Sequence, residues 1–223
     1  MLKIFLWRSI YNYFCFLKLI GFRGAKVHYF AFGANLDPTV LKGRNIIPYS
    51  RTQFVLKNFA IRFNHEIPFK DAAMASIEPS SQENITGVIY EIDKIDERRL
   101  DCMESHIIFN RYGKKYGKDE VGNSFFFYSS NCPKDGLSPT AAYLKKILNG
   151  YELIDPKPTQ FIEKLSRIKT IDGFHPKDPP NFLVKNYNQF GMRLRSTLIW
   201  YDKKCVSVFA SLIFKPSLFE KYF

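Results

Sequence analysis

The feature that most constrains this sequence is an apolar run, Val27 to Phe32, that stops at Gly33. A short apolar run ended by glycine is typical of a buried strand followed by a turn, because glycine tolerates backbone angles and close approaches that other residues do not. Successive backbone N–H groups in such a turn can form a small concavity that binds anions. The side chains of Phe32, Ala34 and Leu36 carry little chemistry of their own. Any chemistry here is therefore expected from the main chain, and a plain strand end is the alternative interpretation.

Residues 29–36 have the sequence YFAFGANL, which resembles the strand-and-loop signature YFAYGSNL of the γ-glutamylcyclotransferase family. Three later stretches resemble the family in the same order: Ala75–Pro79 with Ile85–Ile92, Leu100–Glu104 as the pattern Leu-Asp-x-x-Glu, and Ser138-Pro139 with Tyr143, Leu144 and Ile147 ahead of Gly150. Each match is short, but four in family order, over roughly residues 26 to 170, make the resemblance fairly specific. Two departures remove hydroxyl groups, since Phe32 replaces the usual Tyr and Ala34 the usual Ser, and they leave the substrate open.

This resemblance implies an α+β fold, a mixed β-barrel or sheet with surrounding helices, over residues 26–170. It implies an enzyme that cyclises the γ-glutamyl group of a small substrate to 5-oxoproline and releases an amine or amino acid, with no metal and no cofactor. Glu104 would be its catalytic acid and base. The substrate-binding residues that the resemblance implies are Phe32, Gly33, Ala34, Asn35, Leu36 and Tyr143. A tyrosine at helical spacing with Ile147 is also typical of a core, which is the alternative for Tyr143.

Glu104 is also a candidate from the residues themselves. It lies near the end of a helix expected over residues 93–103, among the apolar side chains of Leu100, Met103 and Ile107. Partial burial and the negative end of a helix dipole favour a carboxylate that can both accept and donate a proton. A solvated carboxylate at a helix end is the alternative, and the place of Glu104 in the Leu-Asp-x-x-Glu pattern favours catalysis.

The cysteines and histidines form no disulfide or metal pattern in the sequence. They are widely dispersed: Cys15, Cys102, Cys132 and Cys205, with His28, His65, His106 and His175. This spacing favours a reducing, cytoplasmic compartment over a disulfide framework or a zinc site. Cys102 and His106 flank Glu104, but the cyclisation needs no covalent intermediate, so we expect neither to act as a nucleophile.

The net charge of +12 is concentrated at the two ends of the chain of 223 residues. Residues 1–25 hold four bases and no acid among large apolar side chains, and residues 171–223 hold eight bases and four acids, so each end carries +4. We therefore divide the chain into an amphipathic segment (1–25), a domain (26–170) and a linker with a helical extension (171–223). The first segment has no apolar run long enough to span a bilayer. As a helix it would lie either on an anionic membrane, together with residues 181–223, or on the protein's own body or a partner. A cleaved targeting segment is the least favoured alternative.

Two functions from other classes are alternatives to the enzyme. A non-catalytic module could keep the fold while its basic ends dock on a membrane or a protein partner. A nucleic-acid binder ranks third, because the sequence has neither a G-x-x-x-x-G-K-[ST] loop nor an RNA-recognition signature. Retention of Glu104 favours the enzyme, and the sequence indicates no oligomeric state. We expect a cytoplasmic protein, with any membrane contact peripheral.

Hydrophobic spacing predicts the elements around the site. Strands are expected over residues 27–32, 52–64 with a break at 57–58, 74–77, 85–92, 107–112 and 124–128. Helices are expected over 38–42, 93–103, from Ser138 to a stop at Gly150, and over 159–168. Turns are expected at Pro79–Gln82 and in a loop marked by Gly113, Gly117 and Gly122. Glu97, Arg98 and Arg99 are expected on a solvated face.

Overall fold

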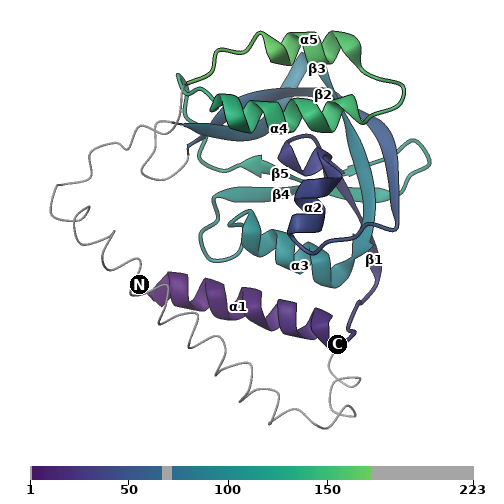
Figure 1. Ribbon diagram of the computed structural model, residues 1–223, viewed down its shortest axis with the longest axis vertical. Helices are drawn as coiled ribbons and strands as arrows, with labels where there is room; N and C mark the ends of the chain where they lie inside the picture. The colour runs from purple at the N-terminus through teal and green to yellow at the C-terminus, as the bar shows by residue number, and fades with distance from the viewer. Residues whose placement is uncertain (1, 67–71, 172–223) are drawn as a thin grey trace, which may run out of the picture. The chain divides into compact units, whose positions relative to one another are not determined.

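A computed structural model describes residues 2–66 and 72–171 of the chain (Figure 1). Within these ranges the elements are α1 (Leu2–Leu19), β1 (Lys26–Ala31), the short 3₁₀ helix η1 (Ala34–Leu36), α2 (Pro38–Gly43), β2 (Ser50–Glu66), β3 (Ala73–Asp93), α3 (Lys94–Met103), β4 (Tyr112–Lys118), β5 (Ser124–Ser130), α4 (Ala141–Glu152) and α5 (Thr159–Ser166). Apart from Ile171, the predicted linker and helical C-terminal extension lie outside the described residues.

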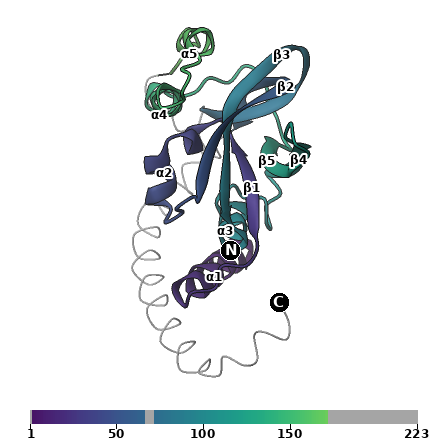
Figure 2. The ribbon, with the colours of Figure 1, turned by 90° about the vertical axis from the view of Figure 1, so that its right-hand side faces the viewer.

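The strand β1 lies at the centre of a five-stranded mixed sheet with the order β2-β3-β1-β5-β4. It pairs antiparallel with β3, from Lys26 opposite Asp93 to Ala31 opposite Val88, and parallel with β5. The outer pairs, β2 with β3 and β4 with β5, are antiparallel. This mixed sheet with its helices confirms the predicted α+β class (Figures 1 and 2). The sheet is open rather than closed into a barrel, since β2 and β4 are its edges among the described strands.

The strands β2 and β3 form a long antiparallel hairpin with one irregular point. The predicted break in β2 is confirmed, because the register shifts between Lys57 and Phe59, where Asn58 has a left-handed φ of 61°. The predicted turn between two shorter strands is wrong, since β3 is a single strand. The residues between Pro79 and Asn84 bulge out opposite Asn58, and pairing then resumes in the same direction.

The predicted strand over residues 107–112 is also wrong, and the glycine-marked loop is shorter than predicted. Gly122 does lie in the turn between β4 and β5, with a left-handed φ of 90°, but Gly113 and Gly117 do not. The strand β4 begins at Tyr112 and runs through Gly113 and Gly117 to Lys118. Gly117 lies opposite Phe125 of β5, and a Cβ atom at Gly117 would lie 2.5 Å from the Phe125 ring. Glycine stands here because an aromatic ring on the neighbouring strand covers the backbone, and the chain does not turn.

The predicted helices over residues 38–42, 93–103 and 159–168 are confirmed within two residues at each end. The helix α2 begins as expected, with the Asp37 side chain accepting a hydrogen bond from the Thr39 N–H group at 2.8 Å. The helix α4 begins later than predicted, at Ala141. Its cap is Thr140, whose hydroxyl accepts from the Tyr143 N–H group at 3.2 Å.

The predicted N-terminal helix is present as α1, and it packs against α3 (Figures 1 and 2). The Trp7 indole donates to the carbonyl oxygen of Cys102 at 2.6 Å, and the Lys18 ammonium pairs with Asp96 at 2.7 Å. None of the described helices is both long and apolar enough to cross a membrane. These contacts support packing of α1 on the protein's own body, and contact with a membrane surface stays a prediction.

Gly150 does not end α4 as predicted, because the helix continues to Glu152. A Cβ atom at Gly150 would lie 2.5 Å from the Leu36 Cβ atom and 2.8 Å from the Asp37 nitrogen. Glycine therefore lets the backbone of α4 approach the end of η1 more closely than any other residue could. One residue further on, the Tyr151 hydroxyl donates to the Phe32 carbonyl oxygen at 2.9 Å, so α4 holds both ends of the loop after β1.

We predict that Gly150→Ala destabilises the protein although alanine favours helices. The gain in helix propensity is about 0.5–1 kcal/mol, whereas the overlap with Leu36 and Asp37 costs about 1–3 kcal/mol. Denaturant unfolding measures the difference, with the exposed Asn149→Ala as the matched control on the same helix. If Gly150→Ala were as stable as Asn149→Ala, the close approach would not constrain this position.

Candidate active site

A pocket lies where the end of β1, η1, the start of β3, the end of α3 and the start of α4 meet. Its walls are formed by Tyr29, Phe32, Gly33, Ala34, Asn35, Arg44, Met74, Ala75, Glu104, Tyr112, Tyr128 and Tyr143. The cavity volume is about 40 Å³, enough for a few groups the size of a water molecule. Six of the seven predicted site residues line this pocket, although they come from three separate stretches of the sequence. The seventh, Leu36, is completely buried in the core.

The loop after β1 forms one wall of the pocket. The backbone at Gly33 has a φ of −107°, so no left-handed conformation explains this glycine. A Cβ atom at Gly33 would lie 3.6 Å from the Ala75 Cβ atom and 3.7 Å from the Tyr143 hydroxyl. These are ordinary contact distances, so neither the backbone angle nor a close approach requires glycine here, and the backbone role of Gly33 stays a prediction. Leu36 lies beneath this wall, where its carbonyl oxygen accepts from the Tyr90 hydroxyl at 2.9 Å.

Glu104 is the residue that directly follows α3, as predicted, and its side chain is 13% exposed. The Arg44 Nη1 atom donates to Glu104 Oε1 at 2.9 Å, and the Asn35 Nδ2 atom donates to the same oxygen at 3.4 Å. Among the described residues, no side chain or backbone group is hydrogen-bonded to the second oxygen, Oε2. One oxygen of the carboxylate is thus held in place while the other can contact a ligand.

Asn35 places an unpaired acceptor beside this carboxylate. Its Nδ2 atom donates to the Tyr29 hydroxyl at 2.7 Å and to Glu104, which as a carboxylate can only accept, so the orientation of the amide follows. The Oδ1 atom is then buried with no hydrogen-bond partner in the described part of the chain. A buried acceptor without a partner costs about 1–3 kcal/mol. In a pocket wall it marks a position for a donor group of a ligand.

Four tyrosines complete the pocket, and all four stay protonated near neutral pH. Burial raises the pKa of Tyr143 to about 12. Burial, followed by the Glu104 charge, raises the pKa of Tyr29. Burial also raises the pKa of Tyr112 and of Tyr128 well above the usual value for tyrosine. Their hydroxyls are therefore neutral donors and acceptors, and Glu104 and Arg44 carry the charges of the pocket.

A second layer of charged side chains supports the pocket from behind. The Tyr128 hydroxyl donates to Asp101 at 2.7 Å, and Lys114 reaches Asp101 and Glu97, each at 2.6 Å. The side chains of Glu97 and Asp101 are 3% and 1% exposed. Glu97 was predicted on a solvated face, and that prediction is wrong because Lys114 of β4 packs over it.

The flanking Cys102 and His106 are not arranged as a nucleophile and base. Burial, and then the Asp101 charge, raises the pKa of the Cys102 thiol to about 12, the opposite of what a reactive thiolate requires. The His106 Nδ1 atom lies 2.9 Å from the carbonyl oxygen of Tyr112, which holds the ring against the backbone. Neither residue lines the pocket.

Of the six pocket residues that were not predicted as site residues, Arg44 is the charged one. It follows α2 in a short polar stretch, and no local pattern separates it from a solvated arginine. Its partner Glu104 is 60 residues further along the chain. Only tertiary packing brings the two side chains together.

The fold class is that of γ-glutamyl cyclotransferases. A solved gamma-glutamyl cyclotransferase is 21% identical over 67% of this chain and 91% of its own, with a TM-score of 0.55. An uncharacterised human protein is 22% identical over 70% of this chain and 95% of its own, also with a TM-score of 0.55. The Bacillus subtilis protein YkqA is 18% identical over 66% of this chain and 56% of its own, with a TM-score of 0.54. No protein-family model matches the sequence, and no curated protein is significantly similar to it.

A buried histidine lies next to the pocket. The His65 ring stacks on Tyr112, with ring centroids 3.8 Å apart. Arg111 can only donate, so the His65 Nε2 atom accepts from its Nε atom at 3.4 Å, and Nδ1–H donates to the Ser130 hydroxyl at 2.9 Å. Burial, and then the Arg111 charge, lowers the pKa of His65 to about 4. The folded protein therefore holds this ring neutral.

We predict that the stability of the fold decreases as the pH falls from about 6.5 to about 4, because the unfolded chain protonates His65 in this range and the folded chain does not. A full difference between these two pKa values corresponds to about 3 kcal/mol. Denaturant unfolding at several pH values measures the slope, which His65→Gln should reduce and the matched His28→Gln should not. An unchanged slope in His65→Gln would contradict the prediction.

Proposed function

We propose that this protein cyclises the γ-glutamyl group of a small amide to 5-oxoproline and releases the attached amine or amino acid. The observation that carries the proposal is the arrangement in the pocket of the Glu104 carboxylate beside the Asn35 Oδ1 atom. Within residues 2–66 and 72–171, neither one oxygen of Glu104 nor Asn35 Oδ1 has a hydrogen-bond partner. Both are acceptors, and the α-ammonium group of a γ-glutamyl compound offers three donors. The fold, shared with a gamma-glutamyl cyclotransferase, supports the same reaction class.

In this mechanism Glu104 moves the protons. Its carboxylate accepts a proton from the α-ammonium group, and the resulting amine attacks the γ-carbonyl carbon. The new C–N bond closes the five-membered ring, and the bond to the leaving nitrogen breaks as Glu104 gives that proton to the leaving nitrogen. The freed carboxylate then takes the second proton from the ring nitrogen and passes it to the released amine, which leaves as an ammonium ion and restores the Glu104 carboxylate. The reaction is intramolecular, so the main task of the pocket is to hold the folded-back conformer, an effect that can reach about 7–11 kcal/mol.

The loop after β1 would stabilise the oxyanion that forms on the γ-carbonyl oxygen. The first N–H groups of a helical turn have no acceptor within the turn, and η1 begins at Ala34 on the pocket wall. Donors fixed in place before the reaction stabilise developing charge without reorganisation. The side chains of Gly33 and Ala34 carry no donor, so the donors to the oxyanion would come from the main chain of this loop.

Arg44 would bind the α-carboxylate of the same γ-glutamyl group. Its guanidinium has five N–H donors, and the described residues occupy one of them, through Glu104. A planar fork of this kind matches a carboxylate in two-point contact. The pocket then offers one cation and one anion, which is complementary to an α-amino-acid group that carries an ammonium and a carboxylate on one carbon.

We predict that Glu104→Gln lowers kcat for release of 5-oxoproline at least about 100-fold, because the amide can neither accept nor return the proton. The assay uses a panel of γ-glutamyl amino acids and γ-glutamyl amines, and the panel also identifies the leaving group. The matched control is Glu120→Gln, on an exposed loop, which should keep the wild-type rate.

Full activity of Glu104→Gln would contradict the mechanism even if the reaction occurs. Release of 5-oxoproline by neither the wild type nor any variant would contradict the proposed function. A non-catalytic module with this fold would then become the better interpretation.

We also predict that Arg44→Gln raises KM about 10- to 100-fold, because a charge-assisted contact to the α-carboxylate is lost. Arg44→Lys should recover part of the affinity, since it keeps the charge and loses the fork. Steady-state kinetics separate this effect on KM from an effect on kcat, with the exposed Arg167→Gln as control. An unchanged KM in Arg44→Gln would remove Arg44 from substrate binding.

A further inference from the structure

We propose that the N-terminal helix α1 is a positioning element of the pocket, and that Lys18 is the side chain through which it acts on Arg44. This inference rests on the proposed function, because it assigns the helix a role in binding the same substrate. The resemblance to the cyclotransferase family begins after α1, at about residue 26, so it gives this helix no role.

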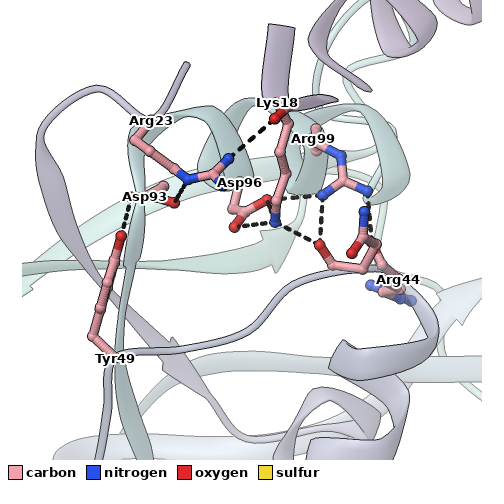
Figure 3. A network of polar contacts seen from close by, with 8 residues as sticks. Lys18, Arg23, Arg44, Tyr49, Asp93, Asp96 and Arg99 are labelled. Atoms are coloured by element: carbon pink, nitrogen blue, oxygen red, sulfur yellow. Dashed lines mark hydrogen bonds and ion pairs between the residues drawn. The ribbon is translucent and has the colours of Figure 1, made fainter. Parts of the chain in front are cut away.

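The turn after α2 is held by a cluster of charged side chains, shown in Figure 3. The Lys18 ammonium donates to the carbonyl oxygen of Asn45 at 2.5 Å. Arg99 of α3 donates to the same oxygen at 3.0 Å and to the carbonyl oxygen of Arg44 at 2.6 Å. Two cations from two helices thus fix the backbone at the residue that carries the pocket guanidinium, and we call Lys18, Asp96 and Arg99 the clamp.

Asp96 binds the two cations of the clamp together. Lys18 contacts both of its carboxylate oxygens, at 2.7 and 2.8 Å, and Arg99 contacts one of them at 2.8 Å. The side chains of Asp96 and Arg99 are 1% and 3% exposed, and that of Lys18 is 13% exposed. Water therefore competes little with the contacts of Asp96, whereas the contact of Lys18 with the Asn45 carbonyl oxygen is exposed.

The turn itself is a Schellman motif that ends α2, in which the Ile46 N–H group donates to the Leu41 carbonyl oxygen and the Asn45 N–H group to that of Lys42, each at 2.9 Å. Asn45 takes the left-handed position of this motif, with a φ of 55°. The clamp adds hydrogen bonds to the carbonyl oxygens of Arg44 and of Asn45 itself. From the same turn the Arg44 side chain extends to Glu104.

The same helix also contacts the backbone beside Glu104. The Trp7 indole donates to the Cys102 carbonyl oxygen, two residues before Glu104. The helix α1 therefore contacts both segments that carry the ion pair of the pocket, through Trp7 at one and Lys18 at the other. A helix that merely covered the apolar side of α3 would not need a hydrogen bond at each of these points.

The test uses the full chain and compares Lys18→Met with Lys3→Met, an exposed lysine on the same helix. Two quantities are measured: KM and kcat for release of 5-oxoproline, and amide hydrogen exchange of residues 44–46. We expect Lys18→Met to raise KM about tenfold while kcat changes less than about twofold, and to speed exchange in the turn about tenfold. Lys18→Arg keeps donors for Asn45 and Asp96 and should restore both quantities. Lys3→Met should match the wild type.

The two measurements also separate this inference from the proposed function. If the wild type releases no 5-oxoproline, the proposed function is wrong. If amide hydrogen exchange of residues 44–46 is equally fast in Lys18→Met and Lys3→Met, the role of the clamp is wrong as well. Faster exchange with an unchanged KM would show that the turn does not position the site and would overturn the inference. A higher KM without faster exchange would overturn the route through the turn. If Lys18→Met lowered the melting temperature but changed neither KM nor the exchange of residues 44–46, α1 would have a purely structural role and the inference would be wrong.

Discussion

The strand β1 is hydrogen-bonded to a neighbour on each side, and this double pairing determines where every wall of the pocket lies. The antiparallel partner β3 continues from Asp93 directly into α3, so the end of that helix, with Glu104, is fixed relative to β1. The loop after β1 is pressed by α4, whose backbone approaches it at Gly150. The loop after β1 and the Glu104 carboxylate lie close together because the loop continues β1 and the helix before Glu104 continues β3, the strand paired with β1.

The ionic contacts around the pocket contribute geometry more than stability. Buried ion pairs are close to break-even in free energy, because removing charges from water costs about as much as their attraction returns. The chain nevertheless buries three carboxylates on α3, at Asp96, Glu97 and Asp101, and pairs them with Lys18, Arg99 and Lys114. Lys18 connects α3 to α1, and Lys114 connects it to β4. Arg99 pairs with Asp96 within α3 and also holds the backbone of the turn after α2. The helix that ends at Glu104 is therefore fixed on several sides.

Much of the fold could be predicted from the sequence, because the apolar runs and caps are local signals. Asp37 with Pro38 marked the start of α2, and the spacing before Met103 marked α3. The glycines were misinterpreted at Gly117 and Gly150, since each permits a contact with a residue on another element that no local pattern reveals. For the site, the resemblance to the γ-glutamylcyclotransferase family predicted Glu104 and the loop after β1. Arg44 and the clamp could not be found this way, because their partners are brought close only by tertiary packing.

The contacts of α1 have a consequence for synthesis of the chain. Lys18 and its partner Asp96 are 78 residues apart, and Trp7 and Cys102 are 95 residues apart. Ribosomes add about 5–20 residues per second, so α1 is complete roughly 4 to 16 s before Asp96 has been made. During this interval the side chains that will pack on α3 have not yet met their partner on the nascent chain. The helix α1 therefore reaches its final contacts only after α3 has been made, and the turn that carries Arg44 acquires its full support only then.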